Sequence, residues 1–312
     1  MIKKPKTKTI KRLALTVLVF GFLILHFFVP RLITEIRNPI VGLIKRNKPV
    51  KVELAANNQS EIIRKDLDII SFDSIKLSAR LTYSSKDSTK GTLILLHGIR
   101  SSKDHFLELS TFLSKNGYNS VALDLRAHGE SEGQFCTFGV KEIKDVKALM
   151  DYLIKNEDIE DIGIWGQSLG GAVALQALGY DNRIKFGIVE STFTDYKTIV
   201  NDYFHLNAGF SFAPFSNYLA NRAASIAGFD PSDAKPIKYC SNITQPTLIV
   251  HGNKDDRINI KYGKQNFSKI KSTDKVFKEI ASANHLNVWK VGSDNYFNEV
   301  LNFINTSTSP NN

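Results

Sequence analysis

The chain has 312 residues, a formal net charge of +10 and only two cysteines. The positive charge belongs to the amino-terminus, because residues 1–51 hold twelve Lys and Arg against one acid, Glu35, while the rest of the chain holds 29 basic and 30 acidic residues. A nucleic-acid-binding domain needs its basic residues on the folded body, so no nucleic-acid partner is expected, and two cysteines cannot form a disulfide framework.

The first predicted element is a membrane-spanning helix at residues 13–30, LALTVLVFGFLILHFFVP, preceded by a basic segment, 1–12. Eighteen residues without Asp, Glu, Lys or Arg are near the minimum for a span. A cleaved signal peptide has a shorter apolar region and small residues at its cleavage site, whereas this run ends in bulky residues. We therefore predict an uncleaved single-pass anchor. Six basic residues before the span, against five within twenty residues after it, favour a cytoplasmic amino-terminus and a domain outside the cytoplasm.

The remainder divides into a predicted juxtamembrane linker, 31–60, one α/β domain, 61–306, and a polar tail, 307–312. Short apolar runs rich in β-branched residues predict strands, and the longer stretches between them predict helices. Strands are expected at 75–83, 92–96, 120–125, 161–166, 186–190, 246–252 and 276–280, and helices at 104–116, 137–156 and 168–179. This alternation predicts a mostly parallel sheet with helices on both faces, whose ligands bind at the carboxyl ends of the strands.

The segment 192–240 interrupts this alternation. A connection of this length between two core strands is too long for an ordinary loop and is expected to carry its own helices. It is also rich in aromatic residues. Two interpretations remain open: the aromatic side chains form the core of a small subdomain, or the segment is a cap with some aromatic residues lining an apolar substrate pocket.

A candidate nucleophile lies in Gly166-Gln167-Ser168-Leu169-Gly170, which has the form G-x-S-x-G. A predicted strand precedes it and a predicted helix follows it, and in this context the motif exposes the serine at a sharp strand-to-helix turn. A serine hydroxyl is a weak nucleophile and needs a base that is oriented by a third group. On this scaffold the order along the chain is serine, acid, histidine.

The acid and the histidine follow in that order. The adjacent pair Asp255 and Asp256 comes directly after the predicted strand 246–252, and His285 is the only histidine after the pair. The predicted oxyanion hole consists of two backbone amides, that of Leu169, after the nucleophile, and that of Ile99, after the predicted strand 92–96. His97 also ends a strand, but the order of the motif makes it a loop-shaping residue rather than the base.

These residues carry a resemblance to a known superfamily. The pieces LLHGIRSS, DLRAHGESEG, GQSLGG, HGNKDDRI and NHLNVW, within residues 92–290, resemble α/β-hydrolases of the group that includes serine aminopeptidase-type hydrolases and monoacylglycerol-lipase-like esterases. The resemblance implies the α/β-hydrolase fold with a helical cap. It also implies that Asp255 is the triad acid, because the group's H-G-x-x-D-x-x-[VI] pattern places Ile258 at its apolar position, and that His128 is structural.

The sequence therefore predicts a membrane-anchored serine hydrolase that cleaves acyl esters, lipid-derived ones included, through Ser168, His285 and Asp255. Its expected partners are a small-molecule ester and the membrane, and no metal or organic cofactor is expected. Two alternatives remain: a peptidase or thioesterase that uses the same residues, and a non-catalytic membrane-tethered binding protein on a hydrolase scaffold.

Overall fold

A computed structural model describes residues 7–40 and 62–308. The start of the predicted basic segment, most of the predicted linker and the end of the predicted tail lie outside the described residues.

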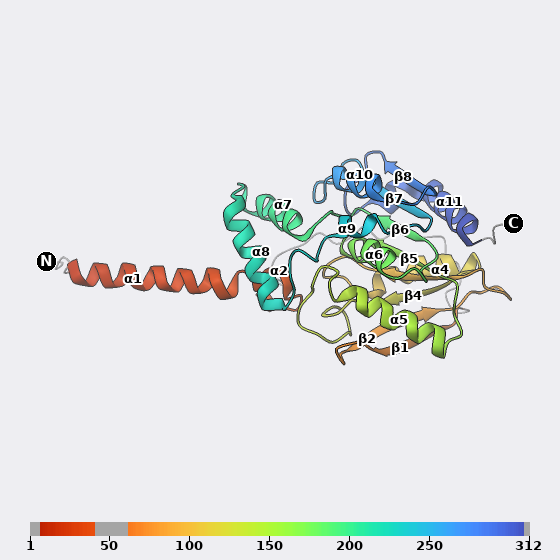
Figure 1. Cartoon of the computed structure of the whole chain (residues 1–312), viewed down its shortest axis with the longest axis horizontal. Helices are drawn as coiled ribbons and strands as arrows, with labels where there is room; N and C mark the ends of the chain where they lie inside the picture. Colours follow the sequence, from red (N-terminus) through yellow and green to blue (C-terminus); the bar gives the residue numbers. More distant parts are fainter. Residues whose placement is uncertain (1–6, 41–61, 309–312) are drawn as a thin grey trace.

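The described domain is built on one eight-stranded sheet with the order β1-β2-β4-β3-β5-β6-β7-β8 (Figure 1). The strand β2 runs antiparallel to both its neighbours, and the pairs from β4 to β8 are all parallel. The strands are β1 (Arg64–Ile70), β2 (Lys76–Thr82), β3 (Thr92–Leu96), β4 (Asn119–Leu123), β5 (Ile162–Gln167), β6 (Gly187–Glu190), β7 (Thr247–Gly252) and β8 (Lys275–Ile280). The predicted fold class is confirmed, and the seven predicted strands match β2 to β8 within two residues at either end.

Helices cover both faces of the sheet, as the buried strands require. In β3, Ile94 and Leu96 belong to one hydrophobic cluster, while Leu93 and Leu95 belong to the other. The helices α5 (Glu142–Asn156) and α6 (Leu169–Tyr180) pack into the first cluster. The helices α4 (Leu107–Lys115) and α11 (Val288–Thr308) pack into the second. The short 3₁₀ helix η3 (Lys103–Phe106) directly precedes α4. Successive side chains of a strand point to opposite faces, so β3 is buried on both.

The helix predicted at 137–156 begins five residues later than expected, at Glu142. Phe138 and Gly139 have positive φ angles of 55° and 109°, which a right-handed helix cannot contain. The Glu142 carboxylate accepts hydrogen bonds from the amides of Thr137 and Gly139, at 2.7 and 2.8 Å. These bonds stabilise a non-helical turn at residues 137–139, where a first helical turn was expected.

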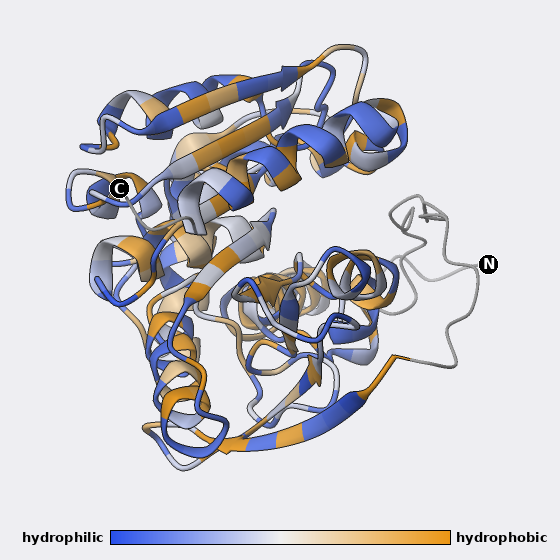
Figure 2. Cartoon of the chain, turned by 90° about the vertical axis from the view of Figure 1, so that its right-hand side faces the viewer, coloured by the Kyte–Doolittle hydropathy of each residue, from blue (hydrophilic) through white to orange (hydrophobic). Residues whose placement is uncertain are grey.

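The strand β1 has no counterpart among the predicted strands. It lies at the edge of the sheet, where only Leu67 and Ile69 are buried. At the bottom of Figure 2 it alternates between hydrophilic and hydrophobic residues. Four of its first five residues, RKDLD, are charged, and they weaken the apolar signal that identified the other strands.

The segment 192–240 carries three helices between β6 and β7: α7 (Tyr196–Ala208), α8 (Ala213–Ala227) and α9 (Pro236–Cys240). Asp195 caps the start of α7 by accepting a hydrogen bond from the Thr198 amide at 2.9 Å. Gly209 and Gly228, with φ angles of 76° and 71°, end α7 and α8 in the left-handed conformation. We refer to α7, α8 and the turn between them as the cap hairpin.

A helical stretch projects from the domain at the amino-terminal side (Figure 1). It consists of α1 (Thr7–Leu23), the π-helical turn η1 (Ile24–Phe28) and α2 (Arg31–Thr34). Its best 18-residue window has a mean hydropathy of 2.4 and is 6% buried, so the helix is long and apolar enough to cross a membrane. A signal sequence near the amino-terminus would have the same properties.

The end of this stretch, α2, and the residues directly after it pack against the domain. Thr34 and Ile36 are buried, and the Arg100 guanidinium donates a hydrogen bond to the Leu32 carbonyl at 2.7 Å. The Cys136 amide donates to the Thr34 carbonyl at 2.8 Å. The side chain of Arg37 donates to the carbonyls of Gly129 and Ser131. The first part of the predicted linker is therefore docked on the domain.

Candidate active site

Ser168 lies at the turn between β5 and α6, where it adopts φ 54° and ψ −114°. A residue other than glycine with positive φ is uncommon, and such strain concentrates at functional sites. The neighbouring strand β6 stabilises this turn, because the Ser168 amide donates a hydrogen bond to the Glu190 carbonyl at 2.9 Å. The strain therefore falls on the candidate nucleophile, and β6 supports it.

The two glycines of the motif serve close packing. A Cβ on Gly166 would lie 2.1 Å from the Gly170 carbonyl oxygen, and one on Gly170 would lie 2.0 Å from the Leu96 carbonyl oxygen. Neither glycine is among the residues with positive φ. Any larger residue would push α6 away from β3 and β5, so the glycines allow the helix to begin directly beside the strand ends.

His285 lies in the loop between β8 and α11 and contacts both other candidate residues. Its Nε2 is 3.1 Å from Ser168 Oγ, and its Nδ1 is 2.8 Å from Asp255 Oδ2. An ionised carboxylate can only accept hydrogen bonds. The proton of neutral His285 therefore belongs on Nδ1, which leaves Nε2 to accept from the Ser168 hydroxyl. The structure thus brings together the three predicted side chains in one hydrogen-bonded chain.

The Asp255 carboxylate is held in its ionised form. Its side chain is fully buried, and burial alone would raise the pKa of this carboxyl, but hydrogen bonds from His251 and His285 lower the pKa below its ordinary value. The amides of Arg257 and Ile258 donate to Asp255 Oδ1 at 3.0 and 2.8 Å. The neighbouring Asp256 is exposed. Of the adjacent acids, Asp255 is the one that faces the histidine.

The two predicted oxyanion donors lie on the loops next to Ser168. Leu169 is the first residue of α6, where backbone amides have no acceptor within the helix. Ile99 follows Gly98, at which an added Cβ would lie 3.4 Å from the Ser168 Cβ and 3.9 Å from its Oγ. The loop after β3 therefore passes directly beside the candidate nucleophile.

Two residues that support this arrangement, His251 and Glu190, are not among those predicted from the sequence. His251 donates from Nε2 to the Ile258 carbonyl at 2.8 Å and lies 3.4 Å from Asp255 Oδ2. Glu190 is a buried carboxylate that accepts hydrogen bonds from Gln167, at 2.5 Å, and from Trp289, at 3.0 Å. Glu190 thereby links the residue before Ser168 to the helix that follows His285. The signal in the sequence that could have identified Glu190 is its position as a charged residue at the end of an otherwise apolar strand, β6.

Two buried histidines shape the loops around the site. The His97 Nδ1 hydrogen-bonds the Gly98 carbonyl at 2.8 Å, and its Nε2 accepts from the Leu125 amide at 3.2 Å. This pairing requires a neutral ring. Burial and the neighbouring His128 lower the pKa of His97 to about 3, and burial lowers the pKa of His128 to about 4. Both rings are therefore neutral at pH 7, in agreement with the structural role predicted for each.

This pair predicts acid sensitivity. In the unfolded chain both histidines take up protons near pH 6.5, whereas in the folded protein they stay neutral until far lower pH. Their stabilising contribution is thus complete above pH 6.5 and is lost as the pH falls toward their folded pKa values. The free energy of unfolding should fall between pH 6.5 and 5, by up to about 1.4 kcal/mol per pH unit for each histidine.

Urea unfolding at several pH values across this window measures the effect. His128→Asn keeps a side-chain donor for the Arg126 carbonyl, which His128 Nδ1 contacts at 2.9 Å, and should flatten the dependence. His205→Asn, at an exposed position of α7, is the matched control and should not change the slope. Equal slopes in all three proteins would contradict the assignment.

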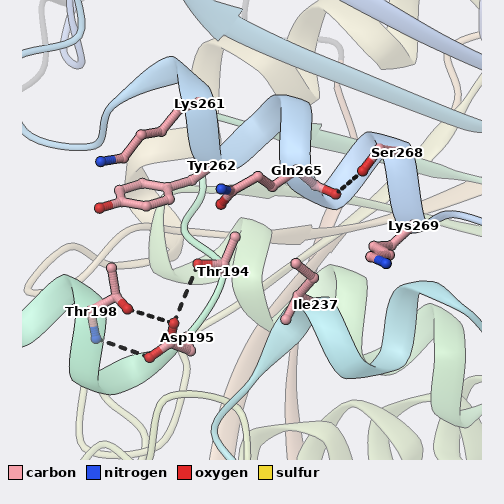
Figure 3. A pocket seen from close by; sticks show the side chains of 9 residues that line it. All are labelled: Thr194, Asp195, Thr198, Ile237, Lys261, Tyr262, Gln265, Ser268 and Lys269. Carbon is pink, nitrogen blue, oxygen red and sulfur yellow. Dashed lines mark hydrogen bonds between the residues drawn. The ribbon is translucent and has the colours of Figure 1, made fainter.

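A separate hollow lies between the start of α7, α9 and α10 (Ile260–Lys269), as Figure 3 shows. It has a volume of about 550 Å³ and is lined by Asp195, Tyr262 and Lys261 among others. None of the five predicted site residues lines it. Among the described residues, no group of three or more His, Cys, Asp or Glu side chains is arranged to hold a metal ion.

Comparisons with known proteins find sequence relatives and similar folds among hydrolases. The sequence model of the family described as Serine aminopeptidase, S33, matches residues 87–223. The protein YfhR of Escherichia coli is 26% identical over 231 residues, which are 72% of this chain and 74% of YfhR. The alpha/beta hydrolase domain-containing protein WAV2 of Arabidopsis thaliana is 26% identical over 254 residues, which are 78% of this chain and 79% of WAV2.

Among solved structures, an esterase from Pyrococcus furiosus superposes with a TM-score of 0.67 at 24% identity, covering 85% of this chain and 99% of that chain. This likeness establishes the α/β-hydrolase fold. The matched family region contains Ile99, Ser168 and Leu169 but ends before Asp255 and His285. The contacts of the acid and the histidine therefore come from the structure of this chain alone.

Proposed function

We propose that this chain, which has the α/β-hydrolase fold, is a serine hydrolase that cleaves carboxylic acyl esters through an acyl-enzyme intermediate. The observation that carries the proposal is the chain of hydrogen bonds from Ser168 Oγ through His285 to Asp255, at 3.1 and 2.8 Å. This arrangement supplies a nucleophile, a base in contact with it and an acid that orients the base.

In the proposed mechanism, His285 Nε2 takes the hydroxyl proton as Ser168 Oγ attacks the ester carbonyl. The amides of Leu169 and Ile99 stabilise the oxyanion of the tetrahedral intermediate. His285 then returns the proton to the departing alkoxide, which leaves the acyl group on Ser168. A water molecule attacks this acyl-enzyme with His285 again as base and releases the carboxylic acid.

An ester is favoured over a peptide by the chemistry of the cap hairpin. Residues 203–221 contain no Asp, Glu, Lys or Arg, so this part of the cap offers no formal charge to bind a free amino-terminus. The structural neighbour from Pyrococcus furiosus is described as an esterase. The family description names an aminopeptidase, which makes peptide cleavage the second candidate.

A substrate panel separates these activities. The full-length protein in detergent should hydrolyse p-nitrophenyl esters of increasing acyl length at rates well above those for aminoacyl anilides and for acyl thioesters. Faster turnover of the anilides would reassign the protein as a peptidase, and faster turnover of the thioesters would reassign it as a thioesterase.

We further propose that residues 13–30 anchor the protein in a membrane and that the domain lies outside the cytoplasm. The length, hydropathy and exposure of the helix Lys8–Thr34 support anchoring. Full-length protein is expected to fractionate with membranes and to resist carbonate extraction, whereas a chain that begins at Arg31 should be soluble. If expression of the full-length chain instead gave soluble protein whose amino-terminus had been removed near residue 30, the segment would be a cleaved signal.

The docked residues 31–38 add a prediction about stability. A chain that begins at Glu53 should also be soluble, but it should unfold at lower urea concentration than a chain that begins at Arg31. The expected difference is about 2–4 kcal/mol, because the burial of Ile36 and the hydrogen bonds of Arg37 are lost. Equal stability of the two proteins would show that these contacts contribute nothing.

A further inference from the structure

The end of the projecting helix is tied to the cap hairpin by an unusual backbone contact. In an α-helix the His26 carbonyl would accept a hydrogen bond from residue 30, but Pro30 has no N–H to donate. The Arg222 Nε of α8 donates to this carbonyl instead, at 3.2 Å. An unpaired carbonyl in a lipid environment costs several kcal/mol, so this contact satisfies a group to which Pro30 cannot donate.

Two further contacts hold α8 at the same level of the helix. The Tyr218 hydroxyl lies 2.6 Å from His26 Nδ1. The Arg222 guanidinium lies 5.4 Å from the centre of the Phe27 ring, which is within the range of a cation–π interaction. Figure 1 shows α8 running across the direction of α1 at the end of the domain from which α1 projects.

The position of His26 along the span sets the depth of α8. Residues 13–30 are flanked by Arg12 and Arg31, and eighteen helical residues span about 27 Å, close to the thickness of the hydrocarbon core. With these two arginines at the two membrane surfaces, His26 lies about 7 Å inside the second surface, since it is five residues before Arg31. The middle of α8, which contacts His26, then lies at about this depth, which is that of an element buried at the boundary between headgroups and acyl chains.

The composition of the cap hairpin suits that location. From residue 203 to 221 the chain carries no formal charge, and three large apolar side chains around the α7–α8 turn are more than half exposed: Leu206 at 52%, Phe210 at 56% and Phe212 at 55%. A dense exposed apolar patch marks an interaction site. Tyr218 and Arg222, with apolar bodies and polar ends, are residue types that favour the boundary between lipid and water.

We propose that the cap hairpin is a membrane-surface element, with Leu206, Phe210 and Phe212 inserted into the bilayer that residues 13–30 cross. The occupant of this patch is a phospholipid bilayer, because Tyr218 and Arg222 of the same hairpin contact His26 and Phe27 of the anchor. This inference rests on the proposed anchoring. It places the cap of the proposed esterase beside the lipid, where an amphiphilic ester would be held.

The test measures the contact between single positions and lipid. Full-length Phe212→Cys, Leu18→Cys and Val276→Cys proteins are labelled with an environment-sensitive thiol probe. They are then reconstituted in vesicles of phosphatidylcholine and phosphatidylglycerol, with and without doxyl-phosphatidylcholine as quencher. The native Cys136 and Cys240 are buried, and protein without an added cysteine reports their background. Val276 is 47% exposed on β8 and serves as the matched control.

The quencher should lower emission at residue 212 about twofold, as expected for a group buried about 5–10 Å below the headgroups, and should leave residue 276 unchanged. Quenching at residue 18 without quenching at residue 212 would overturn the inference and leave the anchor intact; the patch would then belong to a second copy of the chain or to a soluble partner. Absence of quenching at residue 18 would overturn both proposals.

Discussion

Ser168→Ala is expected to lower kcat for ester hydrolysis by on the order of 10⁴- to 10⁶-fold and to abolish covalent labelling by a fluorophosphonate. The reason is that the proposed chemistry begins with the bond from Ser168 Oγ to the acyl carbon. Without Oγ, His285 has no hydroxyl to deprotonate and the acyl-enzyme cannot form. Labelling of the full-length protein and initial rates on a p-nitrophenyl ester measure the two effects independently.

The matched control is Ser268→Ala, at an exposed position of α10. It should label and turn over like the parent protein. A Ser168→Ala protein that hydrolyses the ester at the parent rate would exclude the proposed mechanism. A parent protein that neither labels nor turns over any ester would favour the non-catalytic binding protein.

Asp255→Asn should reduce kcat by about 10⁴-fold, the size of effect that loss of the orienting carboxylate has in serine hydrolases. An Asn amide facing His285 Nδ1 donates a hydrogen bond where the carboxylate accepts one. The ring would then be held with its proton on Nε2, which could no longer accept the Ser168 proton. The neighbouring variant Asp256→Asn should keep nearly full activity, because that side chain is exposed.

The comparison of the two variants tests the assignment more sharply than either variant alone. Both remove one negative charge from adjacent positions, so a general electrostatic effect would lower both rates. A crippled Asp256→Asn protein beside an active Asp255→Asn protein would move the acid by one residue. Because Asp255 also accepts bonds from the amides of Arg257 and Ile258, the folded state of each variant is checked by near-UV circular dichroism.

The sequence by itself was sufficient for the α/β class, for seven of the strands and for the nomination of Ser168, Asp255 and His285. Each of these follows from local signals: apolar runs of strand length, a glycine-flanked serine at a strand-to-helix boundary, and the order of acid and histidine along the chain. Local signals suffice there because periodicity and turn chemistry act over a few residues. They fail at β1, whose charged residues hide a half-buried edge strand.

The tertiary structure alone decided how distant segments meet. Ser168 and His285 are 117 residues apart, and His26 and Tyr218 are 192 residues apart, so no periodicity could report their contacts. The structure also showed that the motif glycines are required by the close approach of α6 to β3 and β5, while Ser168 itself carries the strained backbone. Such effects depend on which elements pack together, because burial and a steric clash exist only once the neighbouring segment is in place.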